Sequence, residues 1–279
     1  MEGYKLTYHV DMVFCIDATG SMRHVLDLVK QNALNLYRDI VAEMEKKHKV
    51  IDQLRVRVIA FRDYVADGDD AMLSSDFFVL PDQAQMLYDC VNGITAKGGG
   101  DIPEDGLEAL AYAIRSDWTR EGVKKRHIIV MWSDAPTHDL GHGKIAPWYP
   151  EGMAKDFDEL SLWWEDEQLG GSMDENAKRL LIFAPDAPSW NRISSEWGQV
   201  IHVQTVSEGL LDVEYRQVLD AALTALADDE RQIVLLHAVT GWKHREIAGL
   251  LELPLSTVLS KYRRALLKLK TKLEGGDAL

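Results

Sequence analysis

Oxygen-bearing side chains gather in three short segments, two of which follow an apolar run. In Asp17-Ala-Thr-Gly-Ser21, alternate residues carry one carboxylate and two hydroxyls, which a tight loop can direct at one point. Asp101 ends the glycine-rich run Lys97-Gly-Gly-Gly-Asp101, and Asp134 follows the apolar run 127–132. Hard oxygen ligands with open positions suit Mg²⁺, with Mn²⁺ or Ca²⁺ as alternatives. Direct ligation by hydroxyls leaves such an ion undercharged, so we expect it to accept a carboxylate from another molecule.

The elements that must position these segments are strands alternating with helices. Short continuous apolar runs predict strands buried on both faces, and 3.6-residue spacing of apolar side chains predicts helices. The alternation predicts an α/β fold with a doubly wound, mainly parallel sheet, whose ligands lie beyond the carboxyl ends of the strands. Residues 141–171 interrupt the alternation and are interpreted as an insertion with one helix at about 154–166. The expected strands are 12–16, 54–61, 77–80, 127–132, 178–184 and 200–204, and the expected helices include 22–45, 82–92, 106–116 and 211–226, the last of which would close the larger domain.

Four motifs give the first part of the chain a family resemblance. Asp17-Ala-Thr-Gly-Ser21 resembles the metal-ion-dependent adhesion site of von Willebrand factor A (vWA) domains, which reads Asp-x-Ser/Thr-x-Ser. The resemblance covers about residues 8–226 and implies a metal site made of Asp17, Thr19 and Ser21, completed by Asp101 and Asp134. Many relatives have a threonine where this sequence has Asp101. Thr95 is a weaker candidate for the role of that threonine. The other three motifs are Phe61-Arg-Asp-Tyr64, Gly98-Gly-Gly-Asp-Ile-Pro-Glu104 and Ser133-Asp-Ala-Pro-Thr-His138.

The same residues allow other interpretations. Thr19 or Ser21 could serve only as a helix cap. Asp63 is expected to stabilise its loop by hydrogen bonds, with a supporting role at the metal as the alternative. A transition-metal site at His138, Asp139 and His142 is disfavoured because the His and Cys spacing matches no zinc pattern, so these are expected to be exposed loop residues. Catalysis is not expected, because Thr19 stands where phosphotransferase-like Asp-x-Asp chemistry would need an acid.

The charge of the chain is unevenly distributed. The formal net charge is −14, which argues against a protein that binds nucleic acid over its whole surface. Residues 242–272, however, hold eight Lys or Arg against two Asp or Glu. An acidic body with a basic C-terminal segment predicts two surfaces with different partners.

The basic segment predicts a small all-α helix-turn-helix domain. Residues 244–251 and 255–273 are expected helices, Pro254 lies at the start of the second, and another helix is expected at 228–239. Residues 229–266 resemble region four of sigma factors of the extracytoplasmic-function type. That resemblance implies contact with promoter DNA and RNA polymerase. The residues expected to face bases or phosphates are Lys243, His244, Arg245, Ser256, Thr257, Ser260, Lys261 and Arg264.

The sequence therefore predicts two modules, a vWA domain at 1–226 and a sigma region-four-like domain at 227–279. A metal-dependent protein-binding domain would be joined to a module that binds DNA or RNA polymerase, in a non-enzymatic transcription-related regulator. No sigma region two is visible, so a complete sigma factor is not expected. Without a signal peptide or a long apolar run, a cytoplasmic bacterial location with no membrane partner is expected. The alternatives are an interaction protein whose helix-turn-helix no longer binds DNA, a metal-dependent hydrolase, and an artificial joining of two domains.

Overall fold

The chain forms two compact units, Met1–Ala222 and Leu223–Leu279. The computed structural model describes residues 7–46, 50–122, 124–166, 171–205, 243–250 and 254–274, with the single residues 210, 218, 219 and 233. Most of the helices expected at 211–226 and 228–239 lies outside the described residues.

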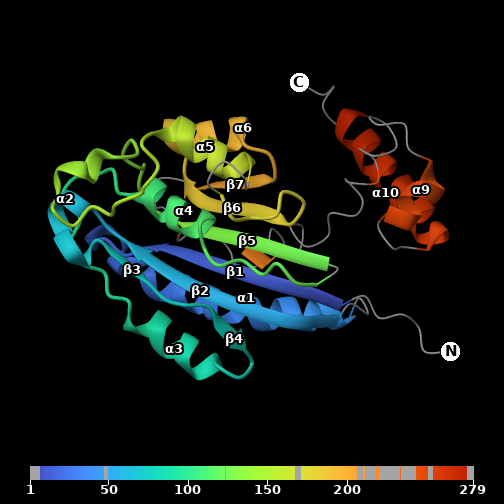
Figure 1. Ribbon diagram of the computed structural model, residues 1–279, viewed down its shortest axis with the longest axis horizontal. Coiled ribbons are helices and arrows are strands. Elements are labelled where there is room, and N and C mark those ends of the chain that lie inside the picture. The colour runs from blue at the N-terminus through green and yellow to red at the C-terminus, as the bar shows by residue number, and fades with distance from the viewer. Residues whose placement is uncertain are drawn as a thin grey trace. The chain divides into compact units, whose positions relative to one another are not determined.

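The first unit is built on a seven-stranded sheet in the order β3-β2-β1-β5-β6-β7, with β4 also paired to β2 (Figure 1). Strands β1 (Thr7–Asp17), β2 (Val50–Phe61), β5 (Lys124–Trp132), β6 (Lys178–Pro185) and β7 (Val200–Thr205) are parallel. The short strands β3 (Met72–Ser74) and β4 (Phe78–Leu80) pair with β2 in the antiparallel sense. The predicted α/β class with a mainly parallel sheet is confirmed.

The position of β1 explains where ligands would bind. It lies between β2 and β5, so the chain leaves β1 towards one side of the sheet and later returns to the other side. A crevice forms beyond the carboxyl end of the strand at which this reversal occurs. The loops after β1 and β5 therefore meet at the same edge.

Helices cover both faces of the sheet. Val13, Cys15 and Met131 pack in one apolar cluster with residues of α4 (Gly106–Ile114), α5 (Phe157–Glu165) and α6 (Pro188–Glu196). Since alternate residues of a strand face opposite sides, Met12, Phe14 and Ile16 point to the other face, where α1 (Leu26–Lys46) lies (Figure 1). Helix α3 (Ala84–Gly93) packs against α1 and β4.

The observed elements extend or subdivide several predicted ones. The helix expected from residue 22 begins as a 3₁₀ turn, η1 (Gly20–His24), and continues as α1. The short elements α2 (Tyr64–Asp67), η2 (Gly68–Asp70) and β3 were not predicted, because three- or four-residue elements show no measurable periodicity. The insertion contains η3 (His142–Ile145) and α5, whose Trp163 and Trp164 are buried as expected for packing residues.

The second unit contains the two expected helices of the basic segment. Helix α9 (His244–Leu250) is followed by α10 (Leu255–Glu274), and the two pack against each other. The carbonyl of Pro254 accepts hydrogen bonds from the Thr257 and Val258 amides at 2.9 and 3.1 Å. Pro254 thus immediately precedes the first residue of α10, where its lack of an N–H costs no helical hydrogen bond. None of the helices in the described part of the chain is long and apolar enough to cross a membrane.

Candidate functional site

A chain of hydrogen bonds joins four of the five residues predicted to bind metal. The Thr19 hydroxyl donates to Asp17 Oδ1 at 2.7 Å and lies 3.0 Å from Ser21 Oγ. Ser21 Oγ in turn donates to Asp134 Oδ1 at 3.0 Å. Although Thr19 stands at the N-cap of η1, its side chain makes no capping bond. The interpretation of this loop as a helix cap alone is therefore disfavoured.

The separation of these oxygens can be compared with metal coordination. At Mg–O distances of about 2.0–2.1 Å, neighbouring ligands of an octahedron lie about 2.9 Å apart. For Ca²⁺ at about 2.3–2.6 Å the same edge would be about 3.3–3.7 Å. The Thr19 Oγ1 to Ser21 Oγ distance of 3.0 Å is that of their hydrogen bond, and it is also compatible with both hydroxyls binding one Mg²⁺ ion.

Asp17 is a buried carboxylate with a concentration of negative charge around it. Burial, followed by repulsion from Asp134, raises the pKa of Asp17 to about 6, against opposing hydrogen bonds from Thr19 and Ser133. Burial also raises the pKa of Asp134. A divalent cation would reverse both effects by favouring the charged carboxylates. The donor set, which consists of oxygens alone, fits such an ion.

A cavity of about 250 Å³ adjoins this cluster and is lined by Ser21, Asp101, Glu104 and Asp134. Asp101 reaches its rim, but its exposed carboxylate lies 3.2 Å from His138 Nε2 rather than in the Asp17 hydrogen-bond chain. Glu104 is buried, and its Oε2 finds no hydrogen-bond partner among the described residues. Burial and the nearby charge of Asp17 raise the pKa of Glu104 to about 9. An orphaned buried carboxylate oxygen beside a cavity is a further feature that fits a cation.

The glycine-rich loop is held in place by specific contacts. Gly98 and Gly99 have φ angles of +70° and +80°, which favour glycine. A Cβ on Gly98 would lie 1.6 Å from Asp67 Oδ1, and the Gly99 amide donates to Asp67 Oδ2 at 2.9 Å. The amide of Gly20 donates to the Gly98 carbonyl at 3.1 Å, which joins this loop to the Asp17 segment.

Arg62 connects three of the loops around the site by hydrogen bonds to their backbone carbonyls. Its buried guanidinium donates to the carbonyls of Ala18 at 3.0 Å, Asp70 at 2.6 Å and Thr95 at 2.9 Å. In this structure the Thr95 carbonyl therefore has a part in the loop framework. The weaker prediction, that Thr95 takes the threonine's role at the metal, stays a prediction.

Three residues that matter here, Ser133, Glu104 and Arg62, were not predicted as site residues from the sequence. Ser133 Oγ donates to Asp17 Oδ2 at 2.7 Å and so fixes the second carboxylate oxygen. All three stand inside the quoted motifs, which was the available signal. Their roles depend on partners distant in the chain, such as Ala18, 44 residues from Arg62, and Asp17, 116 residues from Ser133.

The residues after β2 and β5 form a second polar cluster. Asp63 Oδ1 caps α2 by accepting from the Ala66 amide at 2.7 Å, so the expected loop-stabilising role of Asp63 is found. His138 is only 7% exposed, which corrects the expectation of an exposed loop residue. It is held inside the loop because its backbone amide donates to the Glu104 carbonyl at 2.9 Å and its Nε2 lies 3.1 Å from Asp63 Oδ2.

In the second unit, the predicted DNA-contacting residues are placed on both helices. Ser256, Ser260 and Arg264 are exposed on α10, and Thr257 and Lys261 are partly exposed. Lys243 and Arg245 are exposed at the start of α9, whereas the His244 ring packs edge-on against Tyr262 at 4.7 Å. Val258 is buried, whereas Leu259 is 37% exposed. The DNA contacts themselves stay predictions.

The family comparison identifies the second unit. A family model described as sigma-70, region 4, matches residues 216–269. The C-terminal segment is a sigma region 4 domain. The match begins before the boundary expected at 226/227, inside the helix that was expected to close the larger domain.

Comparisons with curated proteins and solved structures concern about half of the chain. It is 28% identical over 137 residues to an ariadne-like RING finger protein of Acanthamoeba polyphaga mimivirus, covering 48% of this chain and 12% of that protein. It is 25% identical over 158 residues to the alpha-protein kinase vwkA of Dictyostelium discoideum, covering 54% and 23%. The chain thus spans less than a quarter of either relative.

Two solved structures are similar in part to the chain. The pilus adhesin SpaC from Lactobacillus rhamnosus GG has 16% identity and a TM-score of 0.33, covering 46% of this chain and 15% of that one. The vWF domain of the type V pili tip protein Mfa5 from Porphyromonas gingivalis has 20% identity and a TM-score of 0.32, covering 47% and 39%. The vWA resemblance of the first unit is carried by its own sheet order and by the motifs at the ends of β1, β2 and β5.

Proposed function

We propose that the first unit binds Mg²⁺ and uses it to hold a carboxylate of a protein partner. The observation that carries this proposal is the oxygen chain from Asp17 through Thr19 and Ser21 to Asp134, with spacings suited to a magnesium octahedron. Asp101 would complete the site if its exposed side chain turns from His138 towards the cavity. Mn²⁺ and Ca²⁺ are the alternative occupants.

The proposed role is binding, not turnover. Hydroxyl ligands leave the ion with a net positive charge, and the adjoining cavity gives an incoming carboxylate access to it. When bound, the ion supplies an open coordination position. Thr19, Ser21 and Asp134 hold the ion so that this position faces the cavity. Ser133 keeps the Asp17 carboxylate in place behind the hydroxyls.

A metal titration followed by thermal unfolding tests the site. Mg²⁺ should raise the melting temperature of the wild-type protein, and Asp17→Ala should abolish that rise. Asp82→Ala, which removes an exposed carboxylate before α3, is the matched control and should behave as wild type. An unchanged magnesium response in Asp17→Ala would contradict the proposal. A glutamate-rich fluorescent peptide should bind in Mg²⁺ and dissociate in EDTA, and absence of turnover with Mg²⁺ or Mn²⁺ would separate this function from that of a hydrolase.

For the second unit, we propose binding of promoter DNA or RNA polymerase, which makes the chain a transcription-related regulator or adaptor acting in the cytoplasm. The supporting observations are the sigma region 4 match and the basic exposed residues of α10. A module of this size makes few phosphate contacts, so its DNA affinity should fall steeply with salt.

Fluorescence anisotropy with duplex DNA at several salt concentrations tests this part. The double variant Lys261→Ala/Arg264→Ala should bind more weakly, with the slope of log affinity against log salt reduced by about 0.9 for each phosphate that the variant no longer neutralises. The control Arg38→Ala/Lys155→Ala changes the net charge equally on exposed residues of the first unit. Equal decreases of affinity in both double variants, or no binding by wild type to DNA or polymerase, would favour the alternative of a pure interaction protein.

A further inference from the structure

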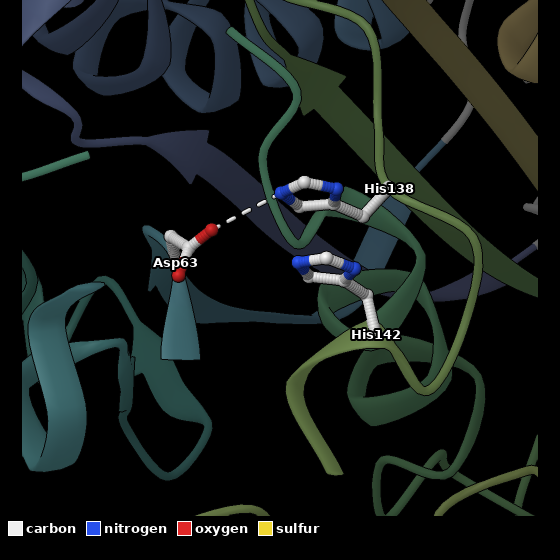
Figure 2. A group of neighbouring side chains, drawn as sticks. All are labelled: Asp63, His138 and His142. Carbon is white, nitrogen blue, oxygen red and sulfur yellow. Dashed lines mark hydrogen bonds and ion pairs between the residues drawn. The ribbon is translucent and has the colours of Figure 1, made fainter. Parts of the chain in front are cut away.

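Two histidines and an aspartate come together beside the candidate magnesium site. Asp63, His138 and His142 each offer a ligand atom, and these atoms lie within 4.8 Å of one another. His138 Nε2 is 3.1 Å from Asp63 Oδ2. The two imidazole rings are stacked, with centroids 3.9 Å apart and an interplanar angle of 6°. Figure 2 shows that both rings turn a nitrogen towards the Asp63 side.

Two members of the cluster are fixed before any ligand arrives. Asp63 is 2% exposed, and its Oδ1 is occupied by the Ala66 amide, so Oδ2 is the atom that faces His138. His138 is 7% exposed, and its backbone amide is bonded to the Glu104 carbonyl at 2.9 Å. His142 is exposed on η3 and is therefore the ligand that can adjust its ring.

The distance between two of the three ligand atoms agrees with that in a site for a small transition-metal ion. With bonds of about 2.0–2.1 Å, neighbouring ligand atoms of a tetrahedral zinc site lie about 3.3–3.4 Å apart. The 3.1 Å pair of Asp63 and His138 is close to this value.

The chemistry of the donors separates this cluster from the oxygen site. Imidazole nitrogens suit zinc and other first-row transition metals, whereas sites made only of oxygens suit Mg²⁺. Nothing in the oxygen chain of Asp17, Thr19, Ser21 and Asp134 offers a nitrogen from a side chain. The two clusters should therefore select different ions.

We propose that Asp63, His138 and His142 form a second metal site, selective for Zn²⁺ or a similar transition-metal ion. His142 closes it by splaying its ring from the stacked position until both imidazole nitrogens point at one ion. This site is independent of the magnesium site in its ligands, so its failure would leave the proposed function untouched.

Zinc binding measured by calorimetry in excess Mg²⁺, which occupies the oxygen site, tests the proposal on the full chain. Wild type should bind zinc, and His142→Gln should weaken it at least tenfold. The matched control His202→Gln, a histidine on β7 whose ring bonds the Ala184 carbonyl, should leave the zinc affinity unchanged. Co²⁺ in place of zinc should give the visible absorption of a nitrogen-ligated site in wild type and lose it in His142→Gln.

His138→Gln provides a second variant, and unfolding without metal checks that each variant folds. Asp17→Ala should lose the magnesium response and keep the zinc affinity. Zinc affinity that is the same in His142→Gln, His138→Gln and wild type would overturn the proposal, as would the absence of zinc binding in excess Mg²⁺. In either case Asp63 and His138 form only a buried hydrogen bond, with the exposed His142 ring stacked on that of His138.

Discussion

The loop framework around the candidate metal centre depends on Arg62, and replacing it by methionine tests this directly. The substitution keeps a side chain of similar length and removes all donors. Three carbonyls, those of Ala18, Asp70 and Thr95, then lose the guanidinium as a donor, although that of Ala18 keeps a backbone donor, the Lys97 amide at 3.1 Å. They belong to three separate loops, so a single change loosens the whole edge of the sheet.

The size of the effect follows from the three bonds. Hydrogen bonds to charged groups contribute about 1.5–3 kcal/mol each. The bonds to Asp70 and Thr95 are partly buried, so water can replace some of them, whereas the bond to Ala18 is buried. We therefore expect Arg62→Met to lower the free energy of unfolding by about 4 kcal/mol, less than the sum of three full bonds. For a unit of this size that corresponds to a melting temperature lower by about 8–16 °C.

Urea unfolding followed by tryptophan fluorescence measures the effect, because Trp132 and Trp190 are buried in the first unit. Arg38→Met is the control: Arg38 is exposed and hydrogen-bonds the nearby Asn35 side chain, so about 0.5 kcal/mol or less is expected. Arg62→Lys should be intermediate, since one ammonium can reach only part of the three carbonyls. If Arg62→Met lost no more stability than Arg38→Met, the assignment of Arg62 as the connector of these loops would be wrong.

Three further outcomes are expected. Ser133→Ala removes the donor to Asp17 and should weaken Mg²⁺ binding by about 10–100-fold in a titration followed by thermal shift, and a titration identical to wild type would contradict its positioning role. Gly99→Ala places a Cβ 2.9 Å from Glu104 Oε1 at a φ of +80° and should cost about 1–3 kcal/mol in urea unfolding, whereas a stability equal to wild type would show that the loop can adapt. His127 donates from Nε2 to the Thr119 carbonyl and accepts the Asp174 amide at Nδ1, and its burial lowers its pKa. Because the unfolded chain then takes up the proton first, wild-type stability should fall as pH drops below about 6.5, by up to about 1.4 kcal/mol per pH unit, and His127→Gln should flatten that dependence.

Much of the fold was predictable because its strands are strongly patterned. The continuous apolar runs of β1, β5 and β6 identified buried parallel strands, and their order along the chain implied helical crossovers. The ends of the elements were less predictable, as β1 extends from Thr7 to Asp17 around the expected 12–16. Strand β3 and helix α2 are too short to show periodicity and owe their conformation to pairing with β2 and to the Asp63 cap.

The candidate site likewise has residues that the sequence could predict and one whose placement it could not. The Asp17-Ala-Thr-Gly-Ser21 loop was readable because its oxygens stand two residues apart, and Asp134 because it directly follows a buried strand. The placement of Asp101 was not readable: a flexible glycine-rich loop leaves its direction open, and in the folded chain it faces His138.

The sequence by itself determined the local chemistry of this protein: which loops carry oxygens, which runs form strands, and which segment carries the helix-turn-helix pattern. Each of these properties depends on residues that belong to the same strand, turn or helix. Only the tertiary structure decided that Ser133 holds Asp17, that Arg62 joins three loops, and that Asp63 faces His138. Those contacts join residues up to 116 positions apart, and burial, which sets their charge and strength, exists only once the sheet brings the strand ends together.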